Sequence, residues 1–327
     1  MANHNGLIVE GLTRVFGKGS KAVHAVQDVN FSVPFGSIHA LLGPNGAGKT
    51  TTVRMCSTLL KPTAGHAVID GVDAVKHPEK ARRSLGLVLG GDLGFYPRAT
   101  AKDNLLFFAD VAGVPWQRRK TEVDNVLTEM QLYEFRNRKA GAFSRGMKQR
   151  LHLARAMLGH PKVLLLDEPT TGLDPEVALS VREIILGLAN TGCAILLTSH
   201  SMGEIEALAG SLSVIGNGRI VVAGQTSDVA QYAGVDNVLT MRLPAQAILM
   251  QEEMSALIGE RGRIVFRAHG SNWDVNVYCE NTSSPAAVLS EIKTFLDEAA
   301  ISPIGEIAFK KATLEDAYLA LAERLHG

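Results

Sequence analysis

The chain has 327 residues, 46% hydrophobic and 20% charged, which is enough for one large globular domain and a smaller one. Its 33 lysines and arginines balance 33 aspartates and glutamates, which argues against a partner bound mainly by charge, such as duplex DNA. Cys56, Cys193 and Cys279 are scattered and odd in number, so we expect small core thiols in a reduced compartment.

The sequence begins without a basic segment followed by an apolar run, so no secretory signal is expected. No stretch approaches the roughly 20 apolar residues that a membrane-spanning helix needs. We therefore expect a soluble chain that acts at a membrane only through a partner.

Residues 5–230 alternate compact apolar runs with helical patterns. The runs are Ile38–Leu42, Val163–Leu166 and Ala194–Thr198, each bounded by turn residues or a motif. Such runs are typical of strands buried on both faces of a mainly parallel sheet, so an α/β domain is expected. Leu7–Val9 and Val29–Val33 indicate an added antiparallel sheet, and residues from about 92 to 160 indicate a helical subdomain.

Residues 236–327 follow a different order, with a domain boundary expected near Ala230–Asp236. The patterns predict, in chain order, strand Val238–Leu243, helix Ala245–Ile258, strands Arg263–Ala268 and Trp273–Cys279, helix Pro285–Ala299 and strand Ile304–Phe309. This βαββαβ order matches the ferredoxin-like motif, so a small C-terminal α+β domain is expected. Thr313 and Asp316 form a capping-box-like start for a closing helix.

One segment matches the phosphate-loop pattern G-x-x-x-x-G-K-[ST] at every fixed position. It is Gly43-Pro44-Asn45-Gly46-Ala47-Gly48-Lys49-Thr50. An apolar run precedes it and a helical pattern, Lys49–Leu60, follows it, whereas a helix entry with incidental glycines requires neither. Glycines let backbone N–H groups point at phosphate oxygens, and the helix presents its positive end to the same anion. The loop therefore predicts ATP binding, with hydrolysis driving another process.

Three side chains of this segment have expected contacts with the nucleotide. Lys49 should reach the β- and γ-phosphates, the Thr50 hydroxyl should bind Mg²⁺, and Thr51 should add a phosphate contact.

Polar residues also follow two other apolar runs. Asp167 ends one of them and is placed to hold Mg²⁺, usually through water, while Glu168 is placed to accept a proton from the attacking water. His200 follows the run Ala194–Ser199 and is placed to donate a hydrogen bond to the γ-phosphate. An isolated Asp-Glu pair is commonly solvated and an isolated histidine commonly structural, so the phosphate loop decides the functional interpretation.

Together these motifs resemble the ATP-binding subunit of ABC transporters. The resemblance runs from about Leu7 to Gly224. It rests on the phosphate loop, Ser144–Arg150, Asp167–Pro169, Thr171–Asp174 and His200. It implies a P-loop NTPase core of the ABC type with antiparallel β and helical subdomains.

The resemblance also implies roles for residues outside the loop. Phe16 would stack on adenine, and Ser144 and Gly146 would contact the γ-phosphate held by a second subunit. Asp174 would lie across the dimer interface. One phosphate loop and one signature segment per chain imply two ATP-binding subunits, as a homodimer arranged head to tail with ATP between them.

The signature segment also has a local physical basis. Ser144 is a good N-cap for the helix expected at Arg145–Leu158, whose first N–H groups would point outward, and Gly146 allows close backbone approach. In isolation, the segment would equally suit a capped amphipathic helix.

Two positions depart from the family pattern. Phe143-Ser144-Arg145-Gly146-Met147 replaces the first Gly and the Gln of the usual Leu-Ser-Gly-Gly-Gln, and forms with a basic residue there resemble exporters whose membrane subunit is a separate ABC-2 type polypeptide. The family places a Gln near Mg²⁺ where this chain has Gly90 or Gly91, with Asp92 as a partial substitute. This second difference bears on the rate of hydrolysis more than on ATP binding.

Aromatic residues follow this glycine segment, and in the family the neighbourhood receives a short helix of the membrane subunit. Phe95 and Tyr96 are therefore candidate partner contacts, although aromatics in helical regions are most often core residues. The C-terminal domain, including Ala312–Tyr318, resembles the tail of many ABC-2 type exporter ATPases and is expected to be accessory or regulatory.

The sequence therefore predicts an ATP-hydrolysing motor, peripheral on the cytoplasmic face of the cell membrane. It would use ATP and Mg²⁺ to energise export of an unidentified substrate through a separate ABC-2 type permease, without nucleic acid. Two alternatives stay open: a soluble ABC ATPase acting on the ribosome or nucleic acid, and a weakly hydrolysing nucleotide-gated regulator.

Overall fold

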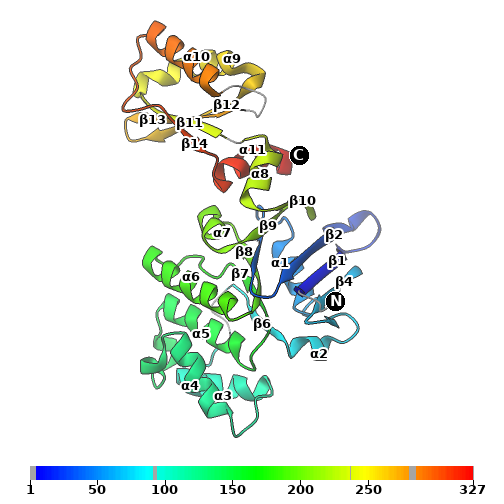
Figure 1. The fold of residues 1–327 in the computed structure, drawn as a ribbon. Helices are drawn as coiled ribbons and strands as arrows, with labels where there is room; N and C mark the ends of the chain where they lie inside the picture. The colour runs from blue at the N-terminus through cyan, green and yellow to red at the C-terminus, as the bar shows by residue number, and fades with distance from the viewer. Residues whose placement is uncertain (1–4, 91–93, 236, 280–284, 327) are drawn as a thin grey trace. The chain divides into compact units, whose positions relative to one another are not determined.

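The computed structural model describes residues 5–90, 94–235, 237–279 and 285–326. Its contacts divide the chain into two compact units, Met1–Ala223 and Gly224–Gly327 (Figure 1). The division falls ahead of the boundary expected near 230–236, because helix α8 (Thr226–Ala233) packs on helix α11 (Leu314–His326) of the second unit. Within the described ranges, no helix is long and apolar enough to cross a membrane.

A six-stranded sheet forms the centre of the first unit, with the strand order β10-β9-β3-β8-β7-β6. The strands are β3 (Ile38–Leu42), β6 (Leu85–Val88), β7 (Val163–Asp167), β8 (Ala194–Ser199), β9 (Ser211–Gly216) and β10 (Arg219–Gly224). The neighbours from β9 to β6 pair in parallel, and every residue of β3, β7 and β8 is buried. The three apolar runs of the sequence thus form the middle of the sheet, where both faces are covered.

The two faces of this sheet pack against different elements. Leu164 and Leu166 of β7 belong to a core shared with the helices α4, α5 and α6. Val163 and Leu165, the alternate residues, belong to a second core with α1 and an antiparallel sheet. Because successive side chains of a strand point to opposite faces, the continuous apolar run serves both cores.

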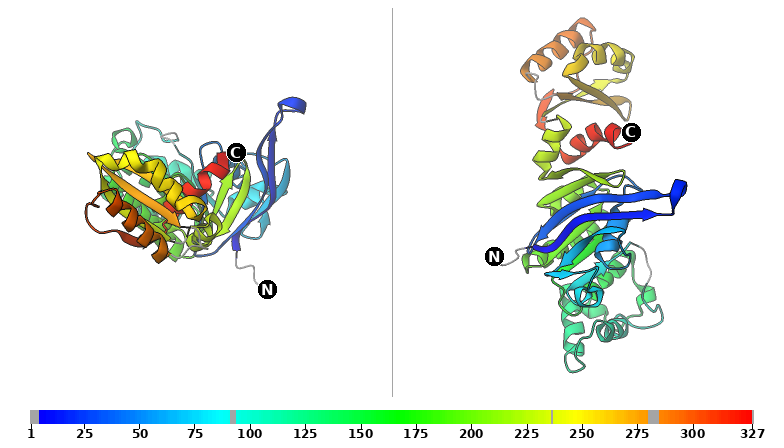
Figure 2. Two further views of the ribbon diagram at one scale, coloured as in Figure 1. Left: turned by 90° about the horizontal axis from the view of Figure 1, so that it is seen from above. Right: turned by 90° about the vertical axis from the view of Figure 1, so that its right-hand side faces the viewer.

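The antiparallel sheet has the order β2-β1-β4-β5. Its strands are β1 (Asn5–Phe16), β2 (Val23–Pro34), β4 (Ala64–Ile69) and β5 (Val72–Asp73). Figure 2 shows β1 and β2 in dark blue as a long hairpin, longer than the expected strands Leu7–Val9 and Val29–Val33. The register of this pair shifts several times, including between Val9 and Leu12, so the alternation of apolar residues is interrupted and the pattern underestimates the strands.

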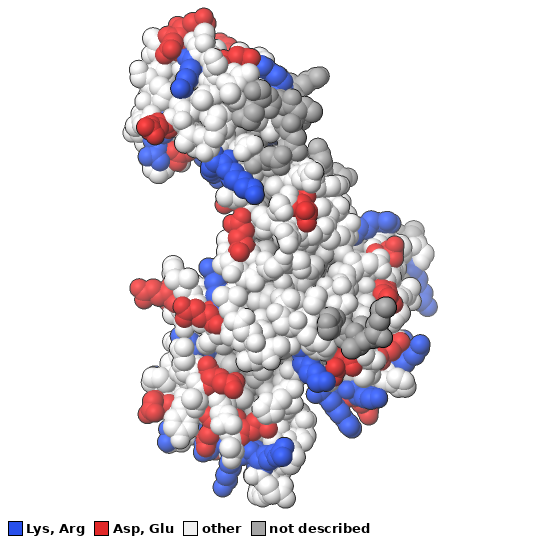
Figure 3. All heavy atoms as spheres, viewed as in Figure 1, with Lys and Arg blue, Asp and Glu red and all other residues white. Residues whose placement is uncertain are grey.

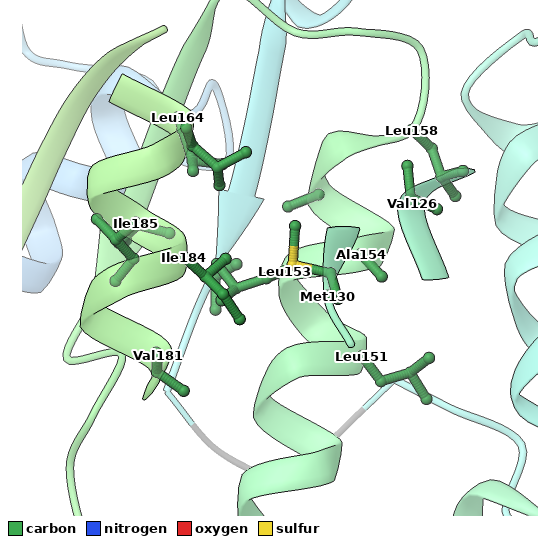
Figure 4. Close-up of a cluster of buried hydrophobic side chains, with 14 of the residues drawn as sticks. Val126, Met130, Leu151, Leu153, Ala154, Leu158, Leu164, Val181, Ile184 and Ile185 are labelled. Atoms are coloured by element: carbon green, nitrogen blue, oxygen red, sulfur yellow. The ribbon is translucent and has the colours of Figure 1, made fainter. Parts of the chain in front are cut away.

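Helices surround the central sheet. They are α1 (Lys49–Cys56), α2 (Pro78–Arg82), α3 (Ala101–Val111), α4 (Arg119–Glu129), α5 (Arg145–Met157), α6 (Pro175–Asn190) and α7 (Met202–Leu208), with short 3₁₀ turns at Gly19–Lys21, Tyr133–Phe135 and Ala140–Ala142. Figure 4 shows Met130, Leu153 and Ile184 meeting where α4, α5 and α6 pack together. The segment expected to be helical, about 92–160, contains α3, α4 and α5 among its described residues.

The second unit has a four-stranded antiparallel sheet with the order β12-β13-β11-β14. Its elements are β11 (Asn237–Pro244), a 3₁₀ segment (Ala245–Met250), α9 (Gln251–Ile258), a 3₁₀ turn (Gly259–Arg261), β12 (Gly262–His269), β13 (Asn272–Cys279), α10 (Pro285–Glu298) and β14 (Ala308–Lys311), between α8 and α11. The last strand was expected earlier, at Ile304–Phe309. Pro303 and Gly305, whose φ is +90°, delay its start because neither continues an extended ladder.

The closing helix α11 begins as its sequence predicts. Thr313 and Asp316 exchange hydrogen bonds, the Asp316 N–H donating to the Thr313 hydroxyl (3.2 Å) and the Thr313 N–H to the Asp316 carboxylate (3.0 Å). The Tyr278 hydroxyl donates to the same carboxylate (3.1 Å). One buried aspartate thus both caps α11 and attaches it to strand β13.

The three cysteines are buried and free. Burial raises the thiol pKa of Cys56 and of Cys193 to about 12. Both therefore stay protonated at neutral pH and act as small apolar core residues.

His39 of β3 is a buried imidazole between two strands. Its Nδ1 lies 2.8 Å from the Ser211 hydroxyl, its Nε2 lies 3.0 Å from the Ser213 hydroxyl, and its ring stacks on Phe31. Burial lowers the pKa of His39 from its ordinary 6.5 to about 4. The folded chain therefore holds this histidine neutral, while the unfolded chain protonates it at a higher pH.

Between pH 6.5 and 4, this difference should make the first unit less stable as the pH falls. Above pH 6.5, His39 is neutral in both the folded and the unfolded chain and does not lower the free energy of unfolding. As the pH falls toward 4, protonation of the unfolded chain lowers this free energy by at most about 3 kcal/mol. Urea denaturation at several pH values measures the slope. His39→Gln should reduce it, while the exposed His24→Gln should leave it unchanged; equal slopes in all three proteins would contradict the assignment.

Candidate active site

Three loops leave the central sheet at one edge. Leu42 of β3 pairs with Ser199 of β8, and Thr198 of β8 pairs with Asp167 of β7. The carboxyl ends of the three adjacent strands therefore lie at the same level. The residues that follow them, Gly43, Glu168 and His200, start from neighbouring points, as is typical of ligand sites in parallel sheets.

The phosphate loop needs its glycines for two different reasons. A Cβ at Gly43 would lie 2.3 Å from the Ile215 carbonyl oxygen, so no side chain fits there. Gly48 has φ +110°, and a Cβ there would lie 2.6 Å from the Ala25 carbonyl oxygen. The loop is thus held against β2 and β9 by contacts that only glycine permits.

Helix α1 begins within this loop, at Lys49, with Gly48 at its N-cap. No side chain of the described chain caps this end of the helix. Its first backbone N–H groups therefore remain available to an anion, and the helix dipole favours negative charge at this point.

Lys49 is buried within the loop. Its ammonium group donates to the carbonyl oxygens of Gly43 (2.6 Å) and Pro44 (3.1 Å). Burial lowers its pKa, and the nearby carboxylates Glu168 and Asp167 oppose that shift. The lysine thus places positive charge between the phosphate loop and the two carboxylates.

Asp167 and Thr50 come together as the sequence predicts. The Thr50 hydroxyl donates to Asp167 Oδ1 at 3.4 Å, and the Thr198 hydroxyl donates to the same oxygen at 2.5 Å. A hydroxyl and a carboxylate are oxygen ligands that suit Mg²⁺, which takes most of its other ligands from phosphate and water. Among the described residues, no group of three or more histidines, cysteines and carboxylates is arranged to hold a metal ion by itself.

Glu168 has an unusual backbone conformation for a non-glycine residue, with φ +53°. Its N–H donates to the Thr198 carbonyl oxygen (3.0 Å), and its Oε2 accepts from the Thr171 hydroxyl (3.1 Å). Its Oε1 lies 3.3 Å from Nδ1 of His200. Strained residues held by several contacts are common at reactive sites, and here the carboxylate of the strained residue lies beside the histidine.

Ser144, Gly146 and Asp174 lie at the starts of two adjacent helices. The exposed Ser144 caps α5, its hydroxyl accepting from the Met147 N–H (3.3 Å), and the exposed Asp174 precedes α6. A Cβ at Gly146 would lie 2.2 Å from Val177 Cγ1 of α6, so this glycine lets the two helices approach. Within the described chain, no hydrogen bond joins Ser144 or Asp174 to the phosphate loop.

Phe16 ends strand β1 and is 40% exposed, with the Arg14 guanidinium 4.6 Å from its ring centre.

Gly90, one candidate for the place of the family's Gln, lies beside the end of β7, where a Cβ would be 3.7 Å from the Asp167 carbonyl oxygen. Gly91 and Asp92 lie outside the described residues.

Sequence reasoning missed the hydroxyl groups around the carboxylates. Thr198 contacts both Asp167 and Glu168, and Thr171 contacts Glu168. A hydroxyl residue at the carboxyl end of the neighbouring strand was the available signal. It carried no information until the pairing of β7 with β8 was known.

Comparison with known proteins decides the family. The ABC transporter family model matches residues 26–171. The ABC transporter ATP-binding protein NatA of Bacillus subtilis is 38% identical over 212 residues, which cover 65% of this chain and 86% of NatA. The chain belongs to the ATP-binding proteins of ABC transporters.

Other members of this ABC family extend the comparison. The doxorubicin resistance ATP-binding protein DrrA of Mycobacterium tuberculosis (strain CDC 1551 / Oshkosh) is 30% identical over 317 residues, which cover 96% of this chain and 93% of DrrA. A solved ATP-binding subunit of an ABC transporter matches with a TM-score of 0.61 and 29% identity, over 70% of this chain and 93% of that one. ABC ATPases hydrolyse ATP to drive transport, and this chain is one of them.

Gly48→Ala should weaken ATP binding by at least about tenfold. The substitution combines a left-handed backbone, which costs an alanine about 1–2 kcal/mol, with the close contact to Ala25. Titration with a fluorescent nucleotide measures the Kd. Gly71→Ala is the matched control, because Gly71 has φ +76° but no atom within 4 Å of an added Cβ. Unchanged affinity in Gly48→Ala would contradict the role given to this contact.

Proposed function

We propose that this ABC ATPase is the motor of an exporter and acts through a separate ABC-2 type membrane subunit. One observation carries the mechanistic part: Lys49, Asp167, Glu168 and His200 converge at a single edge of the sheet. The exporter part is supported by the likeness to DrrA and NatA and by the basic residue Arg145 in the signature segment.

Each converging residue has one proposed task. The loop Gly43–Thr51 binds the phosphates, and Thr50 and Asp167 hold Mg²⁺, which neutralises phosphate charge when bound. Glu168 accepts a proton from the attacking water. His200 keeps Nδ1 toward Glu168, so its Nε2 is directed to the γ-phosphate.

A second copy of the chain, arranged head to tail, is proposed to complete the site. Ser144 and Asp174 are exposed at the starts of α5 and α6 and have no hydrogen bond to the phosphate loop of the described chain. Ser144 and Gly146 would then meet the γ-phosphate held by the partner, with Asp174 at the interface. Phe16, exposed beside Arg14, would stack on adenine.

The membrane subunit is proposed to dock on the first described residues after the glycine segment and on α3. Tyr96 is 57% exposed and packs edge-on against the exposed Phe107 of α3. Val111, one turn after Phe107 in the same helix, is exposed as well. Phe95, the other sequence candidate, packs on Phe108 and His152 instead. Tyr96 is therefore the better candidate for a partner contact, at the cytoplasmic face of the membrane.

The nucleic-acid alternative finds no support on the face of the molecule shown in Figure 3. Acidic and basic side chains are interspersed on the face shown in Figure 3, without a large patch of basic charge.

For the second unit, we propose a ferredoxin-like fold and an accessory or regulatory role. Its antiparallel order β12-β13-β11-β14 is the order that a split βαβ arrangement requires.

Glu168→Gln should retain ATP binding, trap a closed dimer and lower turnover by about 10²–10⁴-fold, the usual share of a general base. Steady-state ATPase assays and size-exclusion chromatography with ATP measure these effects. Glu183→Gln, an exposed change in α6, is the control. Unchanged turnover in Glu168→Gln would remove Glu168 from this role, and the nucleotide-gated regulator would be favoured if wild-type turnover with its partner were negligible.

Lys49→Ala should impair the binding of ATP, whereas Glu168→Gln should impair only its hydrolysis. Loss of the ammonium group at the phosphates should raise the Kd for ATP itself. Equilibrium nucleotide binding measures the change, and wild-type affinity would contradict the assignment of the phosphate loop.

Capture of the chain in mild detergent should recover a membrane protein with about six spanning helices. Tyr96→Ser should reduce the recovery without changing the Kd for ATP, because Tyr96 is exposed and outside the phosphate loop. Thr191→Ser, on the same unit but at the end of α6, is the control. Recovery of ribosomal proteins or nucleic acid in place of a membrane protein would favour the soluble alternative.

A further inference from the structure

Helix α7 carries a buried carboxylate beside the active site. Glu204, in the first turn of α7, is 1% exposed. Its Oε1 accepts a hydrogen bond from the Thr170 hydroxyl at 2.6 Å, and its Oε2 accepts one from the Ser199 hydroxyl at 2.5 Å. Both hydroxyl residues are buried as well.

The two hydroxyls come from the two loops that carry the proposed reactive groups. Thr170 lies two residues after Glu168, in the loop that follows β7. Ser199 ends β8 and immediately precedes His200. One carboxylate therefore joins the loop of the proposed base to the loop of the histidine.

The backbone fixes Glu204 in this position. The Ser201 hydroxyl caps α7 by accepting from the Glu204 N–H (3.4 Å). The Ser199 hydroxyl accepts from the Ser201 N–H (3.0 Å) while it donates to Glu204. The start of α7, the end of β8 and the Glu204 carboxylate thus form one hydrogen-bonded unit.

The energetics make this contact sensitive to change. A buried carboxylate is costly unless hydrogen bonds or a cation satisfy it. In the described part of the chain, no cation forms an ion pair with Glu204, so the two hydroxyls are its stabilising partners. Hydrogen bonds to a charged oxygen are short and strong, and a displacement of either loop weakens one of them.

We propose that Glu204 is a positioning residue for ATP hydrolysis. It holds Thr170 and Ser199 together, and thereby keeps Glu168 and His200 at their separation of 3.3 Å. This inference rests on the proposed roles of Glu168 and His200. It adds that the two loops are coupled through a buried carboxylate to which Thr170 and Ser199 both donate.

Glu204→Ala should lower kcat by about 10²-fold, the loss that a misplacement of about 1 Å produces. The KM for ATP should stay near the wild-type value, because Lys49 and the phosphate loop are untouched. The kcat of Glu204→Gln should lie between those of the wild type and Glu204→Ala. The amide oxygen of the glutamine still accepts from one hydroxyl, and its amide N–H donates to the other. The ATPase assay uses the full-length purified chain.

Glu122→Ala separates positioning from general stability. Glu122 is also a buried carboxylate, on α4, and its Oε1 accepts from the Gly159 N–H at 2.5 Å, remote in the fold from the loops after β7 and β8. Its removal should lower the melting temperature as Glu204→Ala does, but leave kcat unchanged. An equal loss of kcat in both variants would overturn the proposal.

Two hydroxyl deletions test the proposal if Glu204→Ala does not fold. Thr170→Val and Ser199→Ala should each lower kcat, and their effects should be non-additive in the double variant. In a His200→Ala background, Glu204→Gln should cause little further loss. Wild-type kcat in both hydroxyl variants would overturn the role of Glu204, whereas wild-type kcat in Glu168→Gln would overturn the proposed base instead.

Discussion

The register between three buried strands determines where the phosphate loop, Glu168 and His200 begin. Leu42 is level with Ser199, and Thr198 is level with Asp167, so the loops after β3, β8 and β7 start side by side. A shift of one residue in either pairing would turn each side chain to the opposite face. The two apolar cores, one on each face of the sheet, oppose such a shift because both depend on the same alternation of residues.

Hydroxyl groups, more than cations, satisfy the carboxylates at this edge. The Thr198 hydroxyl donates a hydrogen bond to Asp167, and the Thr171 hydroxyl donates one to Glu168. Glu204 accepts from the hydroxyls of Thr170 and Ser199. A hydroxyl donates to a carboxylate without neutralising it. Lys49 is the nearby cation, and Glu168 and Asp167 oppose the lowering of its pKa by burial.

The sequence was informative where one local segment carries the whole signal. The strand and the helix that flank the loop Gly43–Thr50, the three buried strands and the cap of α11 each depend on neighbouring residues, and each lies at its expected place. Contacts between distant segments were not predictable. Glu204 meets Thr170 only because β7 and β8 are adjacent. The late start of β14 was not predicted, because Pro303 and Gly305 interrupt the pattern there. The full length of the β1–β2 hairpin was not predicted, because register shifts interrupt its alternation.

The pairing of α8 with α11 gives the second unit a self-contained construction. Its first helix and its last helix pack on each other, and its sheet takes all four strands from residues after 236. The alignment with NatA spans 212 residues, whereas that with DrrA spans 317. The buried side chains of β11, β13, α9 and α10 form a core made of residues of this unit, so the sheet and its helices bury one another.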